Sequence, residues 1–365
     1  MTRYQIHTHT EREHIAYVLT DTERHAEAAF YPELGANCTH FRTTPDPDGK
    51  DATGSACEPV DIFVPPDLPE DLMLSPFHSG QPILFPFPNR VRNGTYTFEG
   101  KTHHMEKLMA SGRDQGAGQA IHGLVADKVW IVEDAHTDDH HCWVQARLHL
   151  DAFRDIFEQY PYPCRITVTY SLSNGILEMK TEVVNAGIYT LPMGFGIHPW
   201  FPVRLQPGVR LTANPQDVTK EQRGAAQVHV PATAIWELEK LMPTGKVLGV
   251  DTDPAAYDLS TFSPLRDRFF DHVFTRVQRG ADGWSEGGLR DPESHLEMYI
   301  AADGQFREWV LYAPLNRNVI ALEPYTCATD AVNLQPQGID AGLIALPPDQ
   351  TWTGVIRFGL RTYQD

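Results

Sequence analysis

Four short segments combine chemically capable polar side chains with apolar, glycine or proline neighbours. They are Pro82–Arg92 (PILFPFPNRVR), Ala120–Gly123 (AIHG), Gly194–Phe201 (GFGIHPWF) and Ala321–Thr326 (ALEPYT). Glu323 follows an apolar run, and a carboxylate is expensive to bury without a partner, so its position calls for an explanation. His198 lies in a similar setting. Carboxylates and imidazoles are the side chains that most often exchange protons in catalysis, so these residue types suit acid–base chemistry.

Both residues also have a purely structural interpretation. Glu323 could belong to a buried ion pair or lie at a sheet edge, and His198 could be a core histidine whose ring is hydrogen-bonded. Nearby aromatic residues could form apolar walls of a binding site or belong to the core; they are Phe77, Phe85, Phe87, Trp200 and Tyr325. Because four polar segments of this kind occur together, we favour a functional site.

The histidine content raises the question of a metal. Seventeen histidines include three clusters: His7 and His9; His103 and His104; His136, His140 and His141. No HExxH or facial-triad spacing accompanies them, so we interpret the clusters as solvated loops. No GxGxxG sequence opens a helix, and GRDQGAGQ at 112–119 lacks the lysine of a phosphate-binding loop. The sequence therefore predicts neither a metal nor a nucleotide cofactor.

Alternation of apolar and polar residues is the main local pattern, and it predicts strands. The clearest hairpin joins Arg165–Leu172 to Leu177–Val183 through Asn174-Gly175, which tolerates the positive φ angles of a tight turn. Further strands are expected at Val144–Leu150, Thr95–Phe98, Leu296–Ile300, Trp309–Tyr312, Val319–Leu322 and Val355–Leu360. Frequent proline and glycine disfavour long helices, and only Asp151–Tyr160 and Ala232–Leu241 are predicted to be helical. The fold class is therefore all-β, a large antiparallel β-protein.

The chain as a whole is expected to form one unit. The Pro-, Asp- and Gly-rich stretch Thr44–Pro69 is interpreted as a surface excursion, and no linker or repeat marks a boundary, so residues 1–365 are predicted to form a single domain. The formal charge of −18 disfavours nucleic acid and anionic membrane surfaces as partners. Five widely spaced cysteines and the absence of a signal-peptide core favour a reducing, cytoplasmic location.

The four segments, in their order, resemble the aldose 1-epimerase (galactose mutarotase) family. The residues that carry the resemblance are Asn89-Arg90, His122-Gly123, GIHPWF at 196–201 and LEPYT at 322–326. LGANCTHF at 34–41 and GLIALPP at 342–348 also resemble family segments, so the likeness covers almost the whole chain. It implies a large antiparallel β-sandwich of the galactose mutarotase-like supersandwich type. It also implies a small-molecule aldohexose as partner, no cofactor, and a monomer or homodimer.

The resemblance also implies a role for each matching residue. Glu323 would be the general base and His198 the general acid, while His122 and Arg90 would bind and polarise the sugar. Two further positions would bind the substrate.

Asp271, in FFDHVF, matches an acidic residue that binds sugar hydroxyls in the family, and Asp267 is its nearby competitor. Asn89 would contribute either its side-chain amide or the shape of its turn.

The implied reaction needs these residue types. Interconversion of α and β anomers requires the anomeric hydroxyl to lose a proton and the ring oxygen to gain one, followed by bond rotation and reclosure. One base and one acid are sufficient, and each contributes typically ~10²–10⁴-fold. A glutamate and a histidine have opposite charge only within a narrow pH range in water, and mutual attraction in a site is expected to widen it.

Three alternatives use the same residues differently. A hexose-6-phosphate 1-epimerase on this scaffold would need extra cationic groups, for which Arg92 beside Arg90 is the only sign. A glycoside hydrolase could use Asp271 with Glu323, but the histidines would then have no role. A non-catalytic carbohydrate-binding protein would need neither an acid nor a base.

We expect any sugar-isomerising activity to be independent of divalent metal, because no step of the implied reaction requires a Lewis acid. Activity should survive dialysis against EDTA and 1,10-phenanthroline. Complete loss after chelation, with recovery on adding one specific divalent ion, would contradict this.

Overall fold

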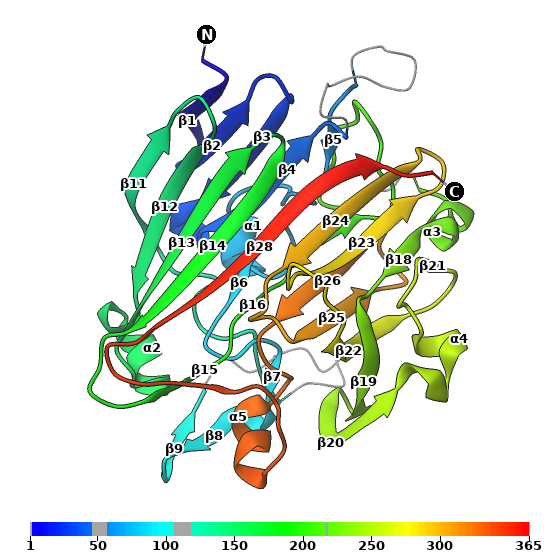
Figure 1. Cartoon of the computed structure of the whole chain (residues 1–365). Coiled ribbons are helices and arrows are strands. Elements are labelled where there is room, and N and C mark those ends of the chain that lie inside the picture. Colours follow the sequence, from blue (N-terminus) through cyan, green and yellow to red (C-terminus); the bar gives the residue numbers. More distant parts are fainter. Residues whose placement is uncertain (1, 46–56, 106–117, 216–217, 365) are drawn as a thin grey trace.

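Antiparallel strands dominate the computed structural model, which describes residues 2–45, 57–105, 118–215 and 218–364 (Figure 1). Three large sheets account for most of them. The N-terminal sheet has five strands in sequence order: β1 (Tyr4–Glu11), β2 (His14–Asp21), β3 (Ala26–Tyr31), β4 (Asn37–Thr43) and β5 (Val60–Asp61).

The nine-stranded sheet forms the layer in front in Figure 1. In spatial order its strands are β11 (Ile131–Thr137), β12 (Cys142–His149), β13 (Cys164–Ser173), β14 (Ile176–Asn185), β28 (Thr351–Thr362), β24 (Leu296–Ala302), β23 (Ser285–Asp291), β18 (Gln227–His229) and β21 (Ser263–Pro264). The C-terminal strand β28 lies between β14 and β24 and so joins the two halves of this sheet.

The eight-stranded sheet carries most of the candidate site. Its strands are β20 (Met242–Gly249), β19 (Ala232–Glu239), β22 (Phe270–Val277), β25 (Glu308–Ala313), β26 (Val319–Tyr325), β16 (Gly196–Ile197) and β6 (Ile83–Leu84), with β17 (Trp200–Pro202) also paired to β26. Three two-stranded ribbons complete the described strands: β7 (Arg90–Val91) with β10 (Ala120–Ile121), β8 (Thr95–Phe98) with β9 (Lys101–His104), and β15 (Leu191–Met193) with β27 (Ile344–Leu346).

Helices are short throughout the described chain. The α-helices are α1 (Asp71–Leu74), α2 (Arg154–Gln159), α3 (Lys220–Ala225), α4 (Pro254–Tyr257) and α5 (Ala331–Leu334). The 3₁₀ turns are η1 (Pro32–Leu34), η2 (Arg92–Gly94), η3 (Leu150–Ala152), η4 (Val250–Thr252) and η5 (Gln335–Gln337). In this part of the chain, none is long and apolar enough to cross a membrane.

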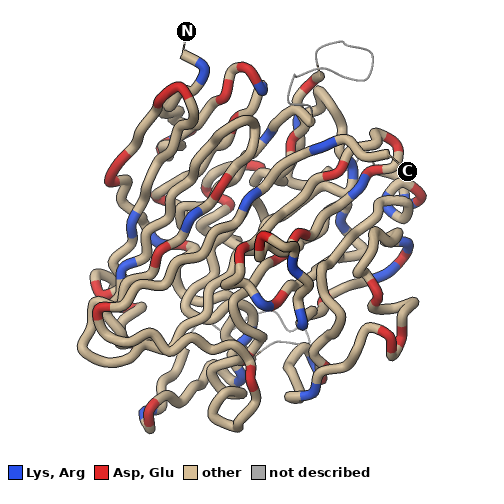
Figure 2. The backbone as a smooth tube through the Cα atoms, in the orientation of Figure 1, with Lys and Arg blue, Asp and Glu red and all other residues tan. Residues whose placement is uncertain are grey.

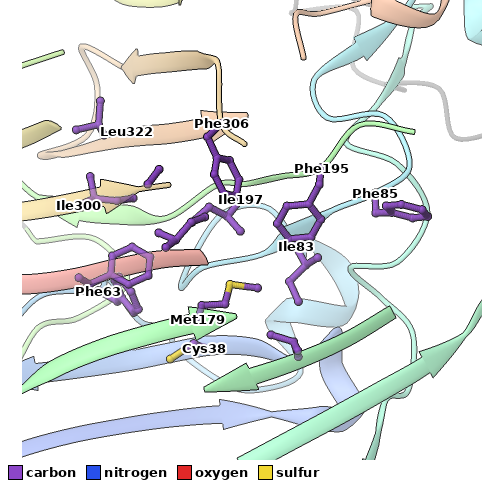
Figure 3. Packing of buried hydrophobic residues seen from close by; sticks show 14 of the residues in the cluster. Cys38, Phe63, Ile83, Phe85, Met179, Phe195, Ile197, Ile300, Phe306 and Leu322 are labelled. Carbon is purple, nitrogen blue, oxygen red and sulfur yellow. The ribbon is translucent and has the colours of Figure 1, made fainter. Parts of the chain in front are cut away.

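One face of the nine-stranded sheet packs against both other large sheets. Phe30 of β3 contacts Tyr170 of β13, with ring centroids 4.9 Å apart, and Phe201 of β17 contacts Phe358 of β28 at 6.4 Å. The same core continues through Phe63, Ile197 and Phe195, which Figure 3 shows between the layers. Because this inner face is apolar, the period-two pattern of the sequence becomes an alternation of buried and less buried positions, clearest in β14.

Most strand predictions are confirmed. The hairpin β13–β14 turns at Asn174 (φ 49°) and Gly175 (φ 72°), both in the left-handed region, as the dipeptide predicts. The segment Asp151–Tyr160 is helical only in part, since η3 covers its start and α2 covers Arg154–Gln159.

The helix predicted at Ala232–Leu241 is wrong. Residues 232–239 form β19, which pairs with β20 on one side and β22 on the other, and the chain reverses at Lys240 and Leu241 with positive φ. Hydrogen bonding to two neighbouring strands outweighs a local propensity that differs little between helix and strand.

The surface excursion predicted at Thr44–Pro69 is wrong for much of the part that the structure describes; residues 46–56 lie outside that part. Val60 pairs with Thr43, and Ile62, Phe63 and Val64 are fully buried. Their apolar side chains add to the core between the sheets, which the surrounding proline and glycine residues obscured in the sequence.

The histidine clusters are not all loops either. His7 and His9 lie in β1, His103 and His104 in β9, and His136 in β11. Among the described residues, no group of three or more histidine, cysteine, aspartate or glutamate side chains could hold a metal ion.

Gly123 provides a test of the backbone that supports the site. Its φ is +76°, and a Cβ at this position would lie 2.0 Å from the carbonyl oxygen of Phe85. Gly123→Ala should therefore lower the free energy of unfolding by about 2 kcal/mol or more. Urea denaturation measures the change, and Gly304→Ala is the matched control because nothing lies within 4 Å of a Cβ there. Equal stability of the two variants would contradict this account.

Candidate active site

The register of the eight-stranded sheet places two acidic side chains on one face. Asp271 of β22 is opposite Tyr312 of β25, and Val310 of β25 is opposite Glu323 of β26. Directly paired residues project to the same side of an antiparallel sheet, and so do residues two apart on one strand. Asp271 and Glu323 therefore share a face, separated by β25.

His198 lies opposite Glu323 because β26 has two short partners. Gly196 of β16 pairs with Tyr325, and Trp200 of β17 pairs with Ala321, so the residue between them faces Glu323. His198 Nε2 lies 3.5 Å from Glu323 Oε1. The backbone N–H of His198 donates to the carbonyl of Pro82 at 3.0 Å, which fixes the segment against β6.

Arg90 and His122 reach the site from the small ribbon β7–β10. Ile121 pairs with Arg90, and the chain turns at Asn89 (φ 59°) and His122 (φ 59°), where the N–H of His122 donates to the carbonyl of Asn89 at 2.8 Å. The His122 ring then meets the His198 ring edge-on, with centroids 5.3 Å apart. Two residues in the left-handed region thus aim these side chains at the sheet, a strain that often accompanies functional sites.

Arg90 links the ribbon to the acidic residues. Its Nη2 lies 3.8 Å from Asp271 Oδ2, and its Nη1 donates to the amide oxygen of Asn89 at 3.1 Å. The structure therefore brings together all six residues that the sequence singled out: Asn89, Arg90, His122, His198, Asp271 and Glu323. The Asn89 amide orients the Arg90 guanidinium, which is one of the two roles that the sequence suggested for Asn89.

Burial is the main influence on the pKa values of Glu323 and His198, the central pair of the site. Burial raises the pKa of Glu323 well above its ordinary value, with a smaller rise from nearby Asp271 and opposing effects of the Tyr325 hydroxyl and Arg90. Burial lowers the pKa of His198 to about 3, and it lowers the pKa of His122 as well. The sequence predicts a charged pair held by mutual attraction, whereas burial favours the neutral form of both residues, because desolvation is the largest effect on each pKa.

Several other expectations are resolved by position. Asp267 is largely exposed and pairs with Lys220, so it does not compete with Asp271. Phe85 and Phe87 belong to the large core, where both contact Tyr160.

Phe77 and Trp200 border the site. The Phe77 ring lies 4.9 Å from that of His122, and Trp200 lies 4.9 Å from His198 while its Nε1 donates to the carbonyl of Phe77.

Sequence reasoning missed two residues at this border. Tyr312 of β25 contacts Trp200 at 5.7 Å, and Arg317 lies over the Trp200 ring at 4.6 Å. Tyr312 could have been found from the alternation of β25, since it is two residues from Val310 and shares its face. Arg317 follows the strand in a turn, where the sequence carries no such signal.

Comparison with known proteins identifies the family of this chain. The Aldose 1-epimerase family profile matches residues 63–359, which is more than half of the chain, and the chain belongs to that family. Among curated relatives, the uncharacterized protein YihR of Escherichia coli K12 is 26% identical over 294 residues, covering 77% of this chain and 79% of that protein.

Solved structures share the fold. A galactose mutarotase-like protein from Clostridium acetobutylicum has a TM-score of 0.81 at 19% identity, with 99% of each chain covered. A GalM/aldose epimerase homologue from C. elegans has a TM-score of 0.69 at 14% identity, covering 99% of this chain and 100% of that one. The fold is therefore the galactose mutarotase-like antiparallel β-sandwich that the sequence predicts.

The depressed pKa of His198 predicts a specific pH dependence of stability. The unfolded chain protonates this residue near pH 6.5, whereas the folded protein does so only near pH 3. The unfolded state therefore binds more protons between these values, and His198 makes the protein less stable as pH falls through this range. His198→Asn should remove about 2 kcal/mol of the stability loss between pH 7.5 and pH 5.

Urea titrations at the two pH values measure this difference. His149→Asn, at an exposed position of β12, controls for loss of an imidazole. An unchanged pH response in His198→Asn would refute the assignment.

Proposed function

We propose that this protein is an aldose 1-epimerase that interconverts the α and β anomers of a neutral hexose, with Glu323 as general base and His198 as general acid. The observation that carries the proposal is the contact between His198 Nε2 and Glu323 Oε1 at 3.5 Å, with Arg90 and Asp271 beside it. A sugar ring has its anomeric hydroxyl and its ring oxygen on neighbouring positions, so an acid and a base this close can serve both.

The reaction begins when Glu323 removes the proton of the anomeric hydroxyl while His198 protonates the ring oxygen. The bond between C1 and the ring oxygen breaks, and the open-chain aldehyde rotates about C1–C2. The hydroxyl then attacks the other face of the carbonyl, returning its proton to His198, and Glu323 protonates the new anomeric oxygen. Each residue ends the cycle in the state in which it began.

The protonation states that burial favours fit one stage of this cycle. After ring opening, Glu323 holds a proton and His198 is neutral, and burial favours these same two states. At the start of the cycle Glu323 is ionised and His198 is protonated. The two side chains together then hold one proton, as they do after ring opening. Hydroxyl groups of a bound cyclic sugar would help to stabilise that charged form, as hydrogen bonds to a carboxylate lower its pKa.

The remaining residues hold the sugar in this proposal. Arg90 and His122 donate to sugar oxygens, Asp271 accepts from sugar hydroxyls, and Asn89 orients Arg90. Phe77, which is partly exposed, offers an apolar face to the C–H groups. Trp200 is buried beside His198 and supports the wall of the site.

Arg92 does not favour the alternative of a phosphorylated substrate, because its side chain already binds Asp330 and the carbonyl of Pro243. A purely carbohydrate-binding protein would not need the close pairing of His198 with Glu323.

Glu323→Gln should lower anomer exchange at least ~100-fold while sugar binding persists, because the amide cannot accept the anomeric proton. His198→Asn should act similarly, whereas Arg90→Lys and Asp271→Asn should mainly raise KM. NMR exchange spectroscopy on glucose and galactose measures turnover, and calorimetry measures binding by the inactive variants.

Glu297→Gln is the matched control, since it alters a buried glutamate of β24 that pairs with Arg290 in the nine-stranded sheet. Near-normal turnover by Glu323→Gln would remove the proposed base.

A further inference from the structure

Tyr325 binds one oxygen of the Glu323 carboxylate. The two residues lie two apart on β26 and so project to the same face, and the Tyr325 hydroxyl donates to Glu323 Oε2 at 2.5 Å. The other oxygen, Oε1, is the one that lies 3.5 Å from His198 Nε2. The two carboxylate oxygens therefore have different partners, and turning the carboxylate plane away from this orientation would break the tyrosine bond.

The tyrosine ring is itself held on both sides. It is fully buried, and its neighbours in the sheet are Glu308 of β25 and Gly196 of β16. A Cβ at Gly196 would lie 2.3 Å from the Tyr325 Cδ1 atom and 2.8 Å from Cε1. Gly196 therefore leaves the space in which the ring lies, and this explains one glycine of the segment GFGIHPWF.

The tyrosine acts as a hydrogen-bond donor and not as an acid. Burial raises the pKa of the Tyr325 hydroxyl well above its ordinary value, and nearby Glu323 raises that pKa further. The phenol therefore keeps its proton at neutral pH. Its donated bond favours the ionised carboxylate and so opposes the effect of burial on the pKa of Glu323.

Building on the proposed function, we propose that Tyr325 is a positioning residue that fixes Glu323 through Oε2, so that Oε1 is the oxygen that accepts the anomeric proton, and that Gly196 provides the space this requires. Tyr325 then contributes to turnover without touching the reacting atoms. A merely structural tyrosine would affect stability but not the pH at which the base ionises.

The first test is Tyr325→Phe, which keeps the ring and removes the hydroxyl. The acidic limb of the pH profile of kcat/KM should move up by about one pH unit, since the carboxylate loses a charge-assisted hydrogen bond. Turnover below this limb should fall about tenfold while KM changes little. Tyr96→Phe is the matched control, because Tyr96 is a buried tyrosine whose hydroxyl donates to a backbone carbonyl, that of Gln159.

Gly196→Ala should shift the limb in the same direction as Tyr325→Phe, because the ring can no longer lie in its place. If Tyr325→Phe fails to fold, 3-fluorotyrosine at position 325 replaces it, since this phenol is a stronger donor and should move the limb down. A pH profile identical to that of the wild type, in Tyr325→Phe or in the fluorotyrosine protein, would overturn the inference.

A measurement without substrate separates this inference from the proposed function. Titration of ¹³C-labelled glutamate, with Glu323→Gln to assign the signal, should show a higher carboxyl pKa in Tyr325→Phe than in the wild type. A wild type that exchanges no anomers would refute the epimerase proposal, and the carboxyl titration would still test the tyrosine bond. An unchanged carboxyl pKa would refute the role of Tyr325.

Discussion

The burial of one carboxyl group, that of Glu323, is the constraint on which the rest of the site depends. Only 1% of the residue is exposed, and an ionised carboxylate is stable in such a place only with hydrogen-bonding or cationic partners. The fold supplies three: the Tyr325 hydroxyl on the same strand, the His198 ring on the neighbouring segment, and Arg90 from the ribbon β7–β10. These partners come from β26, from the segment between β16 and β17, and from the ribbon, so all three segments contact or face the same carboxyl group.

The backbone conforms to this constraint at particular positions. Gly196 has no side chain where the Tyr325 ring lies, and Gly123 approaches the carbonyl of Phe85 too closely for a Cβ. Asn89 and His122 adopt positive φ angles so that their ribbon turns toward the sheet. These positions gather in the same segments as the polar residues, which is why the segments combine chemically active side chains with glycine and proline.

The site differs electrostatically from the surface around it. The chain carries a formal charge of −18, and Figure 2 shows acidic and basic residues interspersed over strands and loops. Within the site, by contrast, His122 and His198 are buried and held neutral at physiological pH, because burial lowers the pKa of each. Interactions of buried polar groups with a ligand are stronger than the same interactions at the surface, since water screens them less. The overall charge therefore says little about the chemistry of the site.

The sequence by itself predicted the class of fold and, through the family resemblance, the residues of the candidate site. Period-two alternation and Asn174-Gly175 are local signals, and the four polar segments are visible because their residue types are unusual among apolar neighbours. The single domain, the location and the oligomeric state stay predictions.

Tertiary structure decided the rest: β19 is a strand because β20 and β22 flank it, and Val60–Val64 is buried because the sheets close over it. It also decided that Tyr325 turns its hydroxyl to Glu323 and that burial favours the neutral forms of Glu323 and His198. Strand pairing and desolvation arise from residues far apart in the chain, so no local pattern contains them.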